Sequence, residues 1–321
     1  MPQVATTLAF ADRLGAWKAR WGIGRLNYLV PPGLYAVGAP TPDAPVLVTA
    51  NYKMSYDIVR SSLTGRNVWL LVLETYGINV WCAAGKGTFG TEELVRRIGI
   101  SGLAGAVMHR RLILPILGAP GVAAHEVKKQ TGFTIRYAAI RAGDLPAYLD
   151  NGMVTTPAMQ ELTFTLRERS VLIPVELVQA LKPTALTAAV LFIAGAALKG
   201  PADGLTTVYA YLGAVVAGAA IAPLLLPWIP GRSFAVKGAV TGLTWITAFY
   251  LLAGGQGWSV PATAAAFLSI PAVSAFYALN FTGCTNYTSR SGVKKEMRIA
   301  LPTMGCAVIF SALMVLAGRF L

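Results

Sequence analysis

Long apolar runs fill the second half of this chain and constrain its fold more than any other feature. A membrane-crossing helix needs about 20 mostly apolar residues. The runs that approach or exceed this length lie at residues 183–199, 205–229, 234–253, 258–281 and 299–320. Small residues within them, as in GAVVAGAA, suit close packing of helices in lipid. We therefore expect an all-α transmembrane domain of about five helices over residues 171–321.

The first half has a different pattern, with charges of both signs throughout residues 1–170. Strand-like runs alternate with helix-like runs there, the strands at 44–51, 67–75, 111–117 and 133–140 and the helices at 56–63, 91–99, 121–132 and 144–152. This alternation predicts an α/β domain with a parallel, Rossmann-like sheet over residues 44–170. Residues 1–43 have no clear periodicity and are expected to wrap the domain. Ligands of such sheets bind beyond the carboxyl ends of strands, which directs attention to the loops after 44–51, 67–82 and 111–117.

The basic residues that give the net charge of +13 lie where they would set the orientation of membrane helices, and they do not form a nucleic-acid-binding face. If the first domain is cytoplasmic, two basic residues, Lys199 and Arg319, fall on the outer side of the membrane. Nine fall on the inner side: Arg167, Arg169, Lys182, Arg232, Lys237, Arg290, Lys294, Lys295 and Arg298. No secretory leader is visible in residues 1–30. We expect a protein of the cytoplasmic (inner) membrane with its first domain in the cytoplasm and its C-terminus outside.

The apolar runs lack charges deep within them, which favours an anchor or docking platform over an ion-coupled pump. The segment 281–298, FTGCTNYTSRSGVKKEMR, is rich in hydroxyl and basic groups. Two interpretations stay open for it: a solvated loop with cations facing lipid headgroups, or a loop that folds back on the first domain.

The stretch INVWCAAGKG, residues 78–87, contains Cys82, the one cysteine of the first half. GKGTFG at 85–90 fits the G-x-G-x-x-G pattern, but no acidic residue closes a strand about 20 positions later. AGKGT resembles the end of a phosphate-binding loop, yet Val80 stands where its first glycine is needed. A Cys–His nucleophile pair with His109 or His125 has no placed acid. We therefore reject nucleotide binding and disfavour hydrolase-type catalysis.

The same stretch resembles a known cap-helix motif. Residues 79–86, NVWCAAGK, fill the pattern N-(V/I)-W-C-A-(A/G)-G-K of the mercury-methylating corrinoid proteins of the HgcA family without a departure. Residues 31–150 as a whole resemble the corrinoid domain of the carbonyl corrinoid/iron-sulfur protein of acetyl-CoA synthesis. The D-x-H-x-x-G signature, by which many corrinoid proteins supply a histidine ligand to cobalt, does not occur in this sequence.

The resemblance implies a cobalamin-type corrinoid cofactor and a first domain tethered to the cytoplasmic face of the membrane. It implies methyl transfer from a methylated Co(III) corrinoid to inorganic Hg(II), giving methylmercury. It also implies a partner, an HgcB-type ferredoxin with two 4Fe–4S clusters, and a methyl donor of the folate type that remethylates the cofactor. The iron-sulfur clusters would belong to the partner alone.

Within this resemblance Cys82 is the catalytic residue and the lower axial ligand of cobalt. A thiolate is a soft, strongly donating ligand, and it stabilises the Co(III) that remains when the methyl group leaves with the electrons of its bond. A carrier that gave its methyl group as a cation would end as Co(I), which a thiolate disfavours. The N-terminus of a helix also favours the thiolate form of a cysteine.

The residues around Cys82 have expected roles. Asn79 caps the helix that presents Cys82, while Gly85 and Gly87 permit close approach to the macrocycle. Trp81 packs either against the cofactor or in the core. The residues that the resemblance implies for cofactor binding are Val48, Thr49, Asn51, Asn79, Val80, Trp81, Ala83, Ala84, Gly85, Lys86, Leu117, Gly118, Ala119, Gly121, Val122, Tyr137 and Arg141.

Two alternatives remain open at this point. The first is a membrane-tethered methyl carrier of one-carbon metabolism, for which mercury is a fortuitous acceptor. The second is a membrane binding or transport protein for mercury or corrinoid. The lack of charges and of paired cysteines along a single apolar run disfavours the second.

Overall fold

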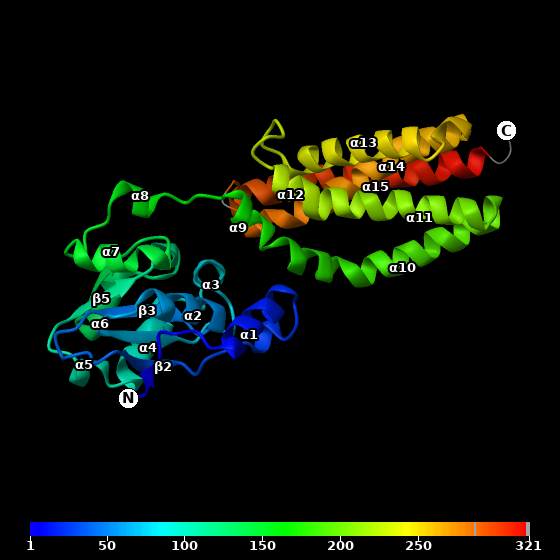
Figure 1. The fold of residues 1–321 in the computed structure, drawn as a ribbon. Coiled ribbons are helices and arrows are strands. Elements are labelled where there is room, and N and C mark those ends of the chain that lie inside the picture. Colours follow the sequence, from blue (N-terminus) through cyan, green and yellow to red (C-terminus); the bar gives the residue numbers. More distant parts are fainter. Residues whose placement is uncertain (286, 319–321) are drawn as a thin grey trace. The chain divides into compact units, whose positions relative to one another are not determined.

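The computed structural model describes residues 1–285 and 287–318 and divides the chain into two compact units, Met1–Thr163 and Phe164–Leu321 (Figure 1). Unit 1 is an α/β domain and unit 2 is helical, which confirms the predicted fold class. Arg319 and residue 286 of the segment 281–298, both used in the sequence predictions, lie outside the described residues.

A six-stranded sheet forms the centre of unit 1, in the order β1-β2-β4-β3-β5-β6. Neighbouring strands run parallel except for β2 and β4, which are antiparallel. The strands are β1 (Gln3–Val4), β2 (Gly33–Val37), β3 (Val46–Ala50), β4 (Val68–Leu73), β5 (Arg111–Leu114) and β6 (Thr134–Tyr137). The sheet is therefore mixed, whereas the alternating pattern predicted a parallel one.

Helices cover both faces of this sheet. Alternate residues of β4 enter two separate hydrophobic cores: Leu71 and Leu73 pack with α3, α4 and α6, and Leu70 and Val72 pack with α2 and α7. The strands are apolar on both faces for this reason. The helices of unit 1 are α1 (Phe10–Arg20), α2 (Lys53–Ser62), α3 (Val80–Lys86), α4 (Thr91–Ile100), α5 (Leu103–Ala106), α6 (Ala124–Thr131), α7 (Leu145–Asp150) and α8 (Pro157–Gln160), with 3-10 turns η1 (Arg25–Asn27), η2 (Ile116–Gly121) and η3 (Ala142–Asp144).

The N-terminal segment, expected to wrap the domain, contributes two strands and a helix. β2 pairs along its whole length with β4, and β1 pairs with β2 at the sheet edge. β2 reads GLYAV between Pro31-Pro32 and Gly38, and its buried residues Leu34 and Val37 do not alternate. β2 is therefore a strand in which buried and exposed side chains do not alternate.

An ion-pair network fastens α1 to α2. The Asp12 carboxylate accepts hydrogen bonds from Lys53 Nζ at 2.5 Å and from an Arg60 terminal nitrogen at 2.7 Å. Asp57 accepts from the same two cations, at 2.7 Å each. Arg60 also donates to the backbone carbonyls of Ala5 and Thr7, so the same side chain holds the segment that precedes α1.

This network predicts acid-sensitive stability. The hydrogen bond from Lys53 is the main cause that lowers the pKa of Asp12 to about 2. The unfolded value is near 4, so the carboxylate stabilises the fold above that pH, and its contribution is lost as the pH falls from about 4 toward 2. We expect Asp12→Asn to lower the free energy of unfolding of unit 1 by about 2 kcal/mol at neutral pH and by almost nothing near pH 2. Urea titration of the detergent-solubilised full chain, read by pulse proteolysis, measures both.

Asp43→Asn is the matched control, because Asp43 is an exposed aspartate in the loop before β3. It should leave the pH dependence unchanged. A loss in Asp12→Asn that is equal at both pH values would contradict the assignment to the charged carboxylate.

Unit 2 contains five helices long and apolar enough to cross a membrane among the described residues: Leu166–Lys199, Pro201–Leu225, Phe234–Leu252, Val260–Asn280 and Ser291–Ala317. Its elements are α9 (Leu166–Ser170), α10 (Ile173–Lys199), α11 (Pro201–Val216), a π-helical turn η4 (Ala217–Ile221), α12 (Ala222–Leu225), α13 (Phe234–Leu252), η5 (Gly255–Gly257), α14 (Val260–Asn280), η6 (Phe281–Cys284) and α15 (Arg290–Ala317). The second half of the segment 281–298 thus forms the first turns of α15, and Phe281–Cys284 form η6.

Small residues and helix-end contacts organise unit 2. A Cβ at Gly238 or Gly242 would approach the α14 backbone within 2.8 Å, so α13 and α14 pack closely because both residues lack one. Lys237, one of the basic residues predicted on the inner side, lies in the first turn of α13, where its Nζ donates to the carbonyls of Leu226 and Ile229. Glu296 of α15 accepts from the Ala235 amide at the start of α13. These contacts satisfy helix-end groups inside the helix assembly.

Candidate functional site

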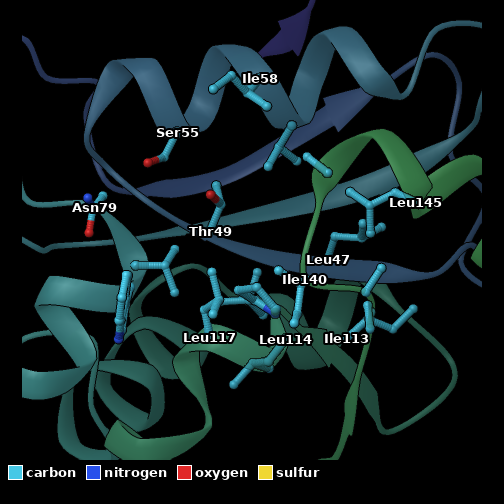
Figure 2. A pocket seen from close by; sticks show the side chains of 18 residues that line it. Leu47, Thr49, Ser55, Ile58, Asn79, Ile113, Leu114, Leu117, Ile140 and Leu145 are labelled. Carbon is cyan, nitrogen blue, oxygen red and sulfur yellow. The ribbon is translucent and has the colours of Figure 1, made fainter. Parts of the chain in front are cut away.

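A pocket of about 300 Å³ opens at the carboxyl end of the sheet. It lies where the chain order reverses around β3, whose neighbours are β4 on one side and β5 on the other. Ligands of open α/β sheets bind at such a point. Figure 2 shows the side chains that surround the cavity: Leu47, Val48, Thr49, Ser55, Ile58, Val59, Asn79, Val80, Trp81, Ile113, Leu114, Pro115, Leu117, Ala138, Ala139, Ile140, Ala142 and Leu145. The lining is mainly apolar, with Thr49, Ser55 and Asn79 as its polar side chains.

The short helix α3 forms one side of this pocket. Asn79 is its N-cap, and the Asn79 side chain accepts a hydrogen bond from the Cys82 amide at 2.9 Å, as predicted. The helix ends at Gly87, whose φ of 83° favours glycine. The first and last residues of the stretch NVWCAAGKG are thus the two caps of a single helix of seven residues.

The side chains of α3 face three environments. Val80 and Trp81 line the pocket, whereas Ala83 and Ala84 are buried in the core against α4 and the sheet. Cys82 lies between them, half-buried and free of any disulfide. The thiol is therefore not a buried core group, and Cys82 itself is not among the residues that line the pocket, which α3 bounds through Val80 and Trp81.

Asn51 holds the loop that leads into α3. Its Oδ1 accepts hydrogen bonds from the Thr75 amide at 3.0 Å and the Thr75 hydroxyl at 2.9 Å, and its Nδ2 donates to Glu74 at 2.6 Å. The residue is almost fully buried. Asn51 therefore positions the start of the cap helix and is not among the residues that line the pocket.

The turn η2 packs directly under α3. A Cβ at Gly121 would overlap the Phe89 carbonyl oxygen and lie 3.0 Å from Ala84 Cα, and a Cβ at Gly118 would lie 2.5 Å from the Phe89 ring. The glycines of LGAPGV therefore allow the close approach of η2 and the cap helix. Their role in this structure is backbone packing.

The predicted cofactor-binding residues fall into three groups. Those that line the pocket are Val48, Thr49, Asn79, Val80, Trp81 and Leu117. Those that support the pocket from the core or beneath the cap helix are Asn51, Ala83, Ala84, Gly118, Ala119, Gly121, Val122 and Tyr137, the last of which donates to the Val122 carbonyl at 3.4 Å. Gly85, Lys86 and Arg141 are exposed.

The sequence prediction did not identify the far wall of the pocket. Ser55, Ile58 and Val59 come from α2, Ile113, Leu114 and Pro115 from the end of β5, and Ala138, Ala139 and Ile140 from the segment after β6. The end of the predicted strand 133–140 could have pointed to part of this wall, because Ala138, Ala139 and Ile140 are its last residues. The strand belongs to the same parallel set, so its carboxyl end lies at the same edge of the sheet.

The described residues contain no group of three or more His, Cys, Asp and Glu side chains placed to hold a metal ion. His109 lies before β5, at the amino end of the strand, where its Nε2 is 2.9 Å from the Ala44 carbonyl oxygen. His125 is exposed at the start of α6. Neither histidine is among the residues that line the pocket, and the nearest charged partner of His125 is Glu126, at 3.6 Å.

Comparison with known proteins places the similarity in unit 1. Residues 25–148 match the family model described as CO dehydrogenase/acetyl-CoA synthase delta subunit. This range contains the whole pocket and the cap helix, and it ends before the five apolar helices.

Curated relatives have the same extent of similarity. The chain is 32% identical over 123 residues to the acetyl-CoA decarbonylase/synthase complex subunit gamma of Methanopyrus kandleri, which is 38% of this chain and 26% of that protein. The same values hold for the subunit gamma of Archaeoglobus fulgidus. For that of Methanocaldococcus jannaschii the identity is 35% over 107 residues, 33% of this chain and 22% of the relative. The chain thus spans about a quarter of the length of the curated relatives it matches.

Proposed function

We propose that this chain is a membrane-anchored corrinoid protein that transfers a methyl group to inorganic Hg(II), giving methylmercury. The observation that carries the proposal is Cys82, free, half-buried and presented by a capped helix beside the pocket at the carboxyl end of the sheet. The uninterrupted NVWCAAGK motif supports the mercury-methylating function. The matches of residues 25–148 to proteins of acetyl-CoA synthesis support the resemblance of unit 1 to a corrinoid domain.

The residues at the site suit a corrinoid. This cofactor brings its own equatorial nitrogen ligands to cobalt, so one protein ligand is enough, and Cys82 is a lone candidate ligand in a region without a multi-residue metal cluster among the described residues. An apolar lining with three polar side chains suits an organic group no larger than the cavity. A corrin ring with its substituents is larger than this cavity. The cavity would therefore hold only an appended part of the cofactor, and α3, which bounds the cavity, would contact the rest.

When bound, the corrinoid supplies a methyl group carried on cobalt. Cys82 would hold the metal through its thiolate, a soft donor that favours the oxidised metal left after transfer. Asn79 keeps the Cys82 backbone in place through the N-cap hydrogen bond. Asn51 fixes the preceding loop and so limits the movement of the thiol. The chain's own contribution is thus the identity and the fixed position of one ligand.

The visible absorption spectrum of the purified chain tests the proposal. We expect a corrinoid spectrum in the wild type and a changed spectrum in Cys82→Ser, because the axial ligand is altered. A protein that contains no corrinoid after reconstitution would contradict the cofactor assignment, and an identical spectrum in both proteins would contradict the axial ligand.

The exposed glycine of the cap helix gives an independent prediction. A Cβ at Gly85 meets no atom of the protein within 4 Å, so Gly85→Ala should leave the corrinoid-free protein as stable as the wild type or up to about 1 kcal/mol more stable. If the ring lies against α3, the added methyl group should weaken corrinoid binding about ten-fold. Titration of the apo chain with a corrinoid, followed by absorbance, measures the affinity. An unchanged affinity would place the ring elsewhere.

A second candidate function is favoured by the names of the relatives. Subunits of the acetyl-CoA decarbonylase/synthase complex act in one-carbon metabolism, so a membrane-tethered methyl carrier of that metabolism is the alternative, with mercury as a fortuitous acceptor. For either function we propose an HgcB-type ferredoxin with two 4Fe–4S clusters as reductant and a folate-type methyl donor. We also propose that unit 1 faces the cytoplasm at the inner membrane.

A further inference from the structure

The helix α1 of unit 1 has its apolar face turned away from the domain. Phe10, Leu14, Trp17 and Trp21 follow the spacing i, i+4, i+7 and i+11, so they form one stripe along the helix. Their exposed fractions are 78%, 36%, 57% and 38%. The two indole rings lie side by side, with centroids 6.0 Å apart. We call these four residues the α1 stripe.

The polar contacts of α1 explain this inverted orientation. Asp12 lies on the opposite side of the helix from the stripe and is held by Lys53 and Arg60 of α2. Ala19, on the same inner side, is fully buried. The helix is therefore attached to unit 1 through ion pairs and small side chains, and its largest apolar side chains are left facing outward. Ile23 and Leu26, in the turns that follow the helix, are exposed as well.

Basic residues flank the stripe on both sides. In a helical projection Arg13 lies beside one edge of the stripe and Lys18 beside the other, and both are exposed. Over residues 8–26 the chain has four basic residues and a single acidic one, Asp12, whose charge is already neutralised by α2. Tryptophan, phenylalanine and leucine flanked by Lys and Arg are typical of helices that lie in the interface of an anionic membrane.

We propose that α1 docks on the surface of the membrane that unit 2 spans, with the α1 stripe inserted among the lipid headgroups. The occupant of the stripe is thus a phospholipid surface containing anionic lipid. The five apolar helices on the same chain keep a bilayer close to unit 1, and tethering of this kind raises the effective concentration of a weak second contact. Arg13 and Lys18 supply attraction to anionic headgroups, and the two tryptophans suit the polar–apolar boundary.

The test places a fluorescent probe within the stripe of the full chain. Leu14→Cys is labelled with an environment-sensitive dye in a background with Cys82→Ala, Cys284→Ala and Cys306→Ala, and the protein is reconstituted into phosphatidylcholine vesicles with or without phosphatidylglycerol. The substitution leaves Trp17 and Trp21 in place. Lys129→Cys, an exposed site on α6, is labelled as the matched control. Lipids with a nitroxide near the headgroup serve as quenchers.

We expect the Leu14→Cys probe to be quenched at least about three-fold more than the Lys129→Cys probe in vesicles that contain phosphatidylglycerol, since only the former would reach the interface. Arg13→Glu combined with Lys18→Glu should remove most of this difference, as should high salt. Equal, weak quenching at both sites would overturn the proposal. A second result would also overturn the proposal: a Leu14→Cys probe that is shielded from water in both detergent and vesicles but is not quenched by the labelled lipid. The stripe would then pack on protein.

Discussion

Replacing Cys82 with alanine is expected to abolish the formation of methylmercury by the corrinoid-loaded chain. The substitution removes the thiolate that would hold cobalt, while the backbone amide of residue 82 still donates to Asn79 and the short side chain fits a half-buried position. Loss of groups that only support a metal ligand costs 10- to 100-fold, so loss of the ligand itself should lower methyl transfer by at least about 100-fold. Methylmercury produced from Hg(II) by the full chain with its reductant and methyl donor is the measurement.

Cys306→Ala is the matched control, because Cys306 is an exposed thiol in α15 and lies outside unit 1. It should retain full activity if Cys82 acts as a ligand and not as one of several mercury-binding thiols. Equal losses in both variants would favour a thiol relay. Normal methylation by Cys82→Ala would contradict the axial-ligand assignment and favour the methyl carrier of one-carbon metabolism, which should tolerate loss of the thiol.

The elements of unit 1 that were predicted well have strong local signals. The helix predicted at 91–99 is observed at Thr91–Ile100, where Glu92 and Glu93 occupy the first turn. The Asn79 cap of α3 was also predicted, because a cap depends on a side chain that few other residues supply. Gly87, predicted to approach the macrocycle, is instead the residue that ends α3. In contrast, β2 was missed because it pairs with β4 through backbone groups and has no alternating pattern of its own.

The pocket was predicted in its location but not in its composition. A loop beyond the carboxyl end of a strand can be assigned from the order of elements. The side chains that close the cavity cannot, because β3 and β5 are apolar on both faces and the pattern does not say which residues face the ligand. Ile58 and Val59 of α2 read as ordinary core residues. Their position above the pocket depends on how α2 packs across the sheet.

The role of individual charged residues in the membrane half could not be predicted from the sequence either. Lys237 was counted with the inner-side basic residues at the start of the run 234–253, and in the structure its ammonium group donates to the carbonyls of Leu226 and Ile229. Hydropathy locates a span within a few residues but does not reveal which flanking cation is used to end a neighbouring helix. Counts of basic residues therefore predict orientation better than they predict the role of any one lysine.

The close packing between η2 and α3 leads to the second large expected effect, from Gly121→Ala. The new methyl group would overlap the Phe89 carbonyl oxygen and press on Ala84 Cα, both backbone atoms with no rotamer to change. We expect unit 1 to lose about 3 kcal/mol of stability, measured by urea-dependent pulse proteolysis of the corrinoid-free full chain. Since Ala84 is in the cap helix, α3 should shift and move Cys82, so corrinoid affinity should fall at least about ten-fold.

Gly99→Ala is the control, because a Cβ there meets no atom within 4 Å. If Gly121→Ala kept both its stability and its affinity, η2 would have no part in placing the thiol, and the position of Cys82 would depend on Asn51 and Asn79 alone.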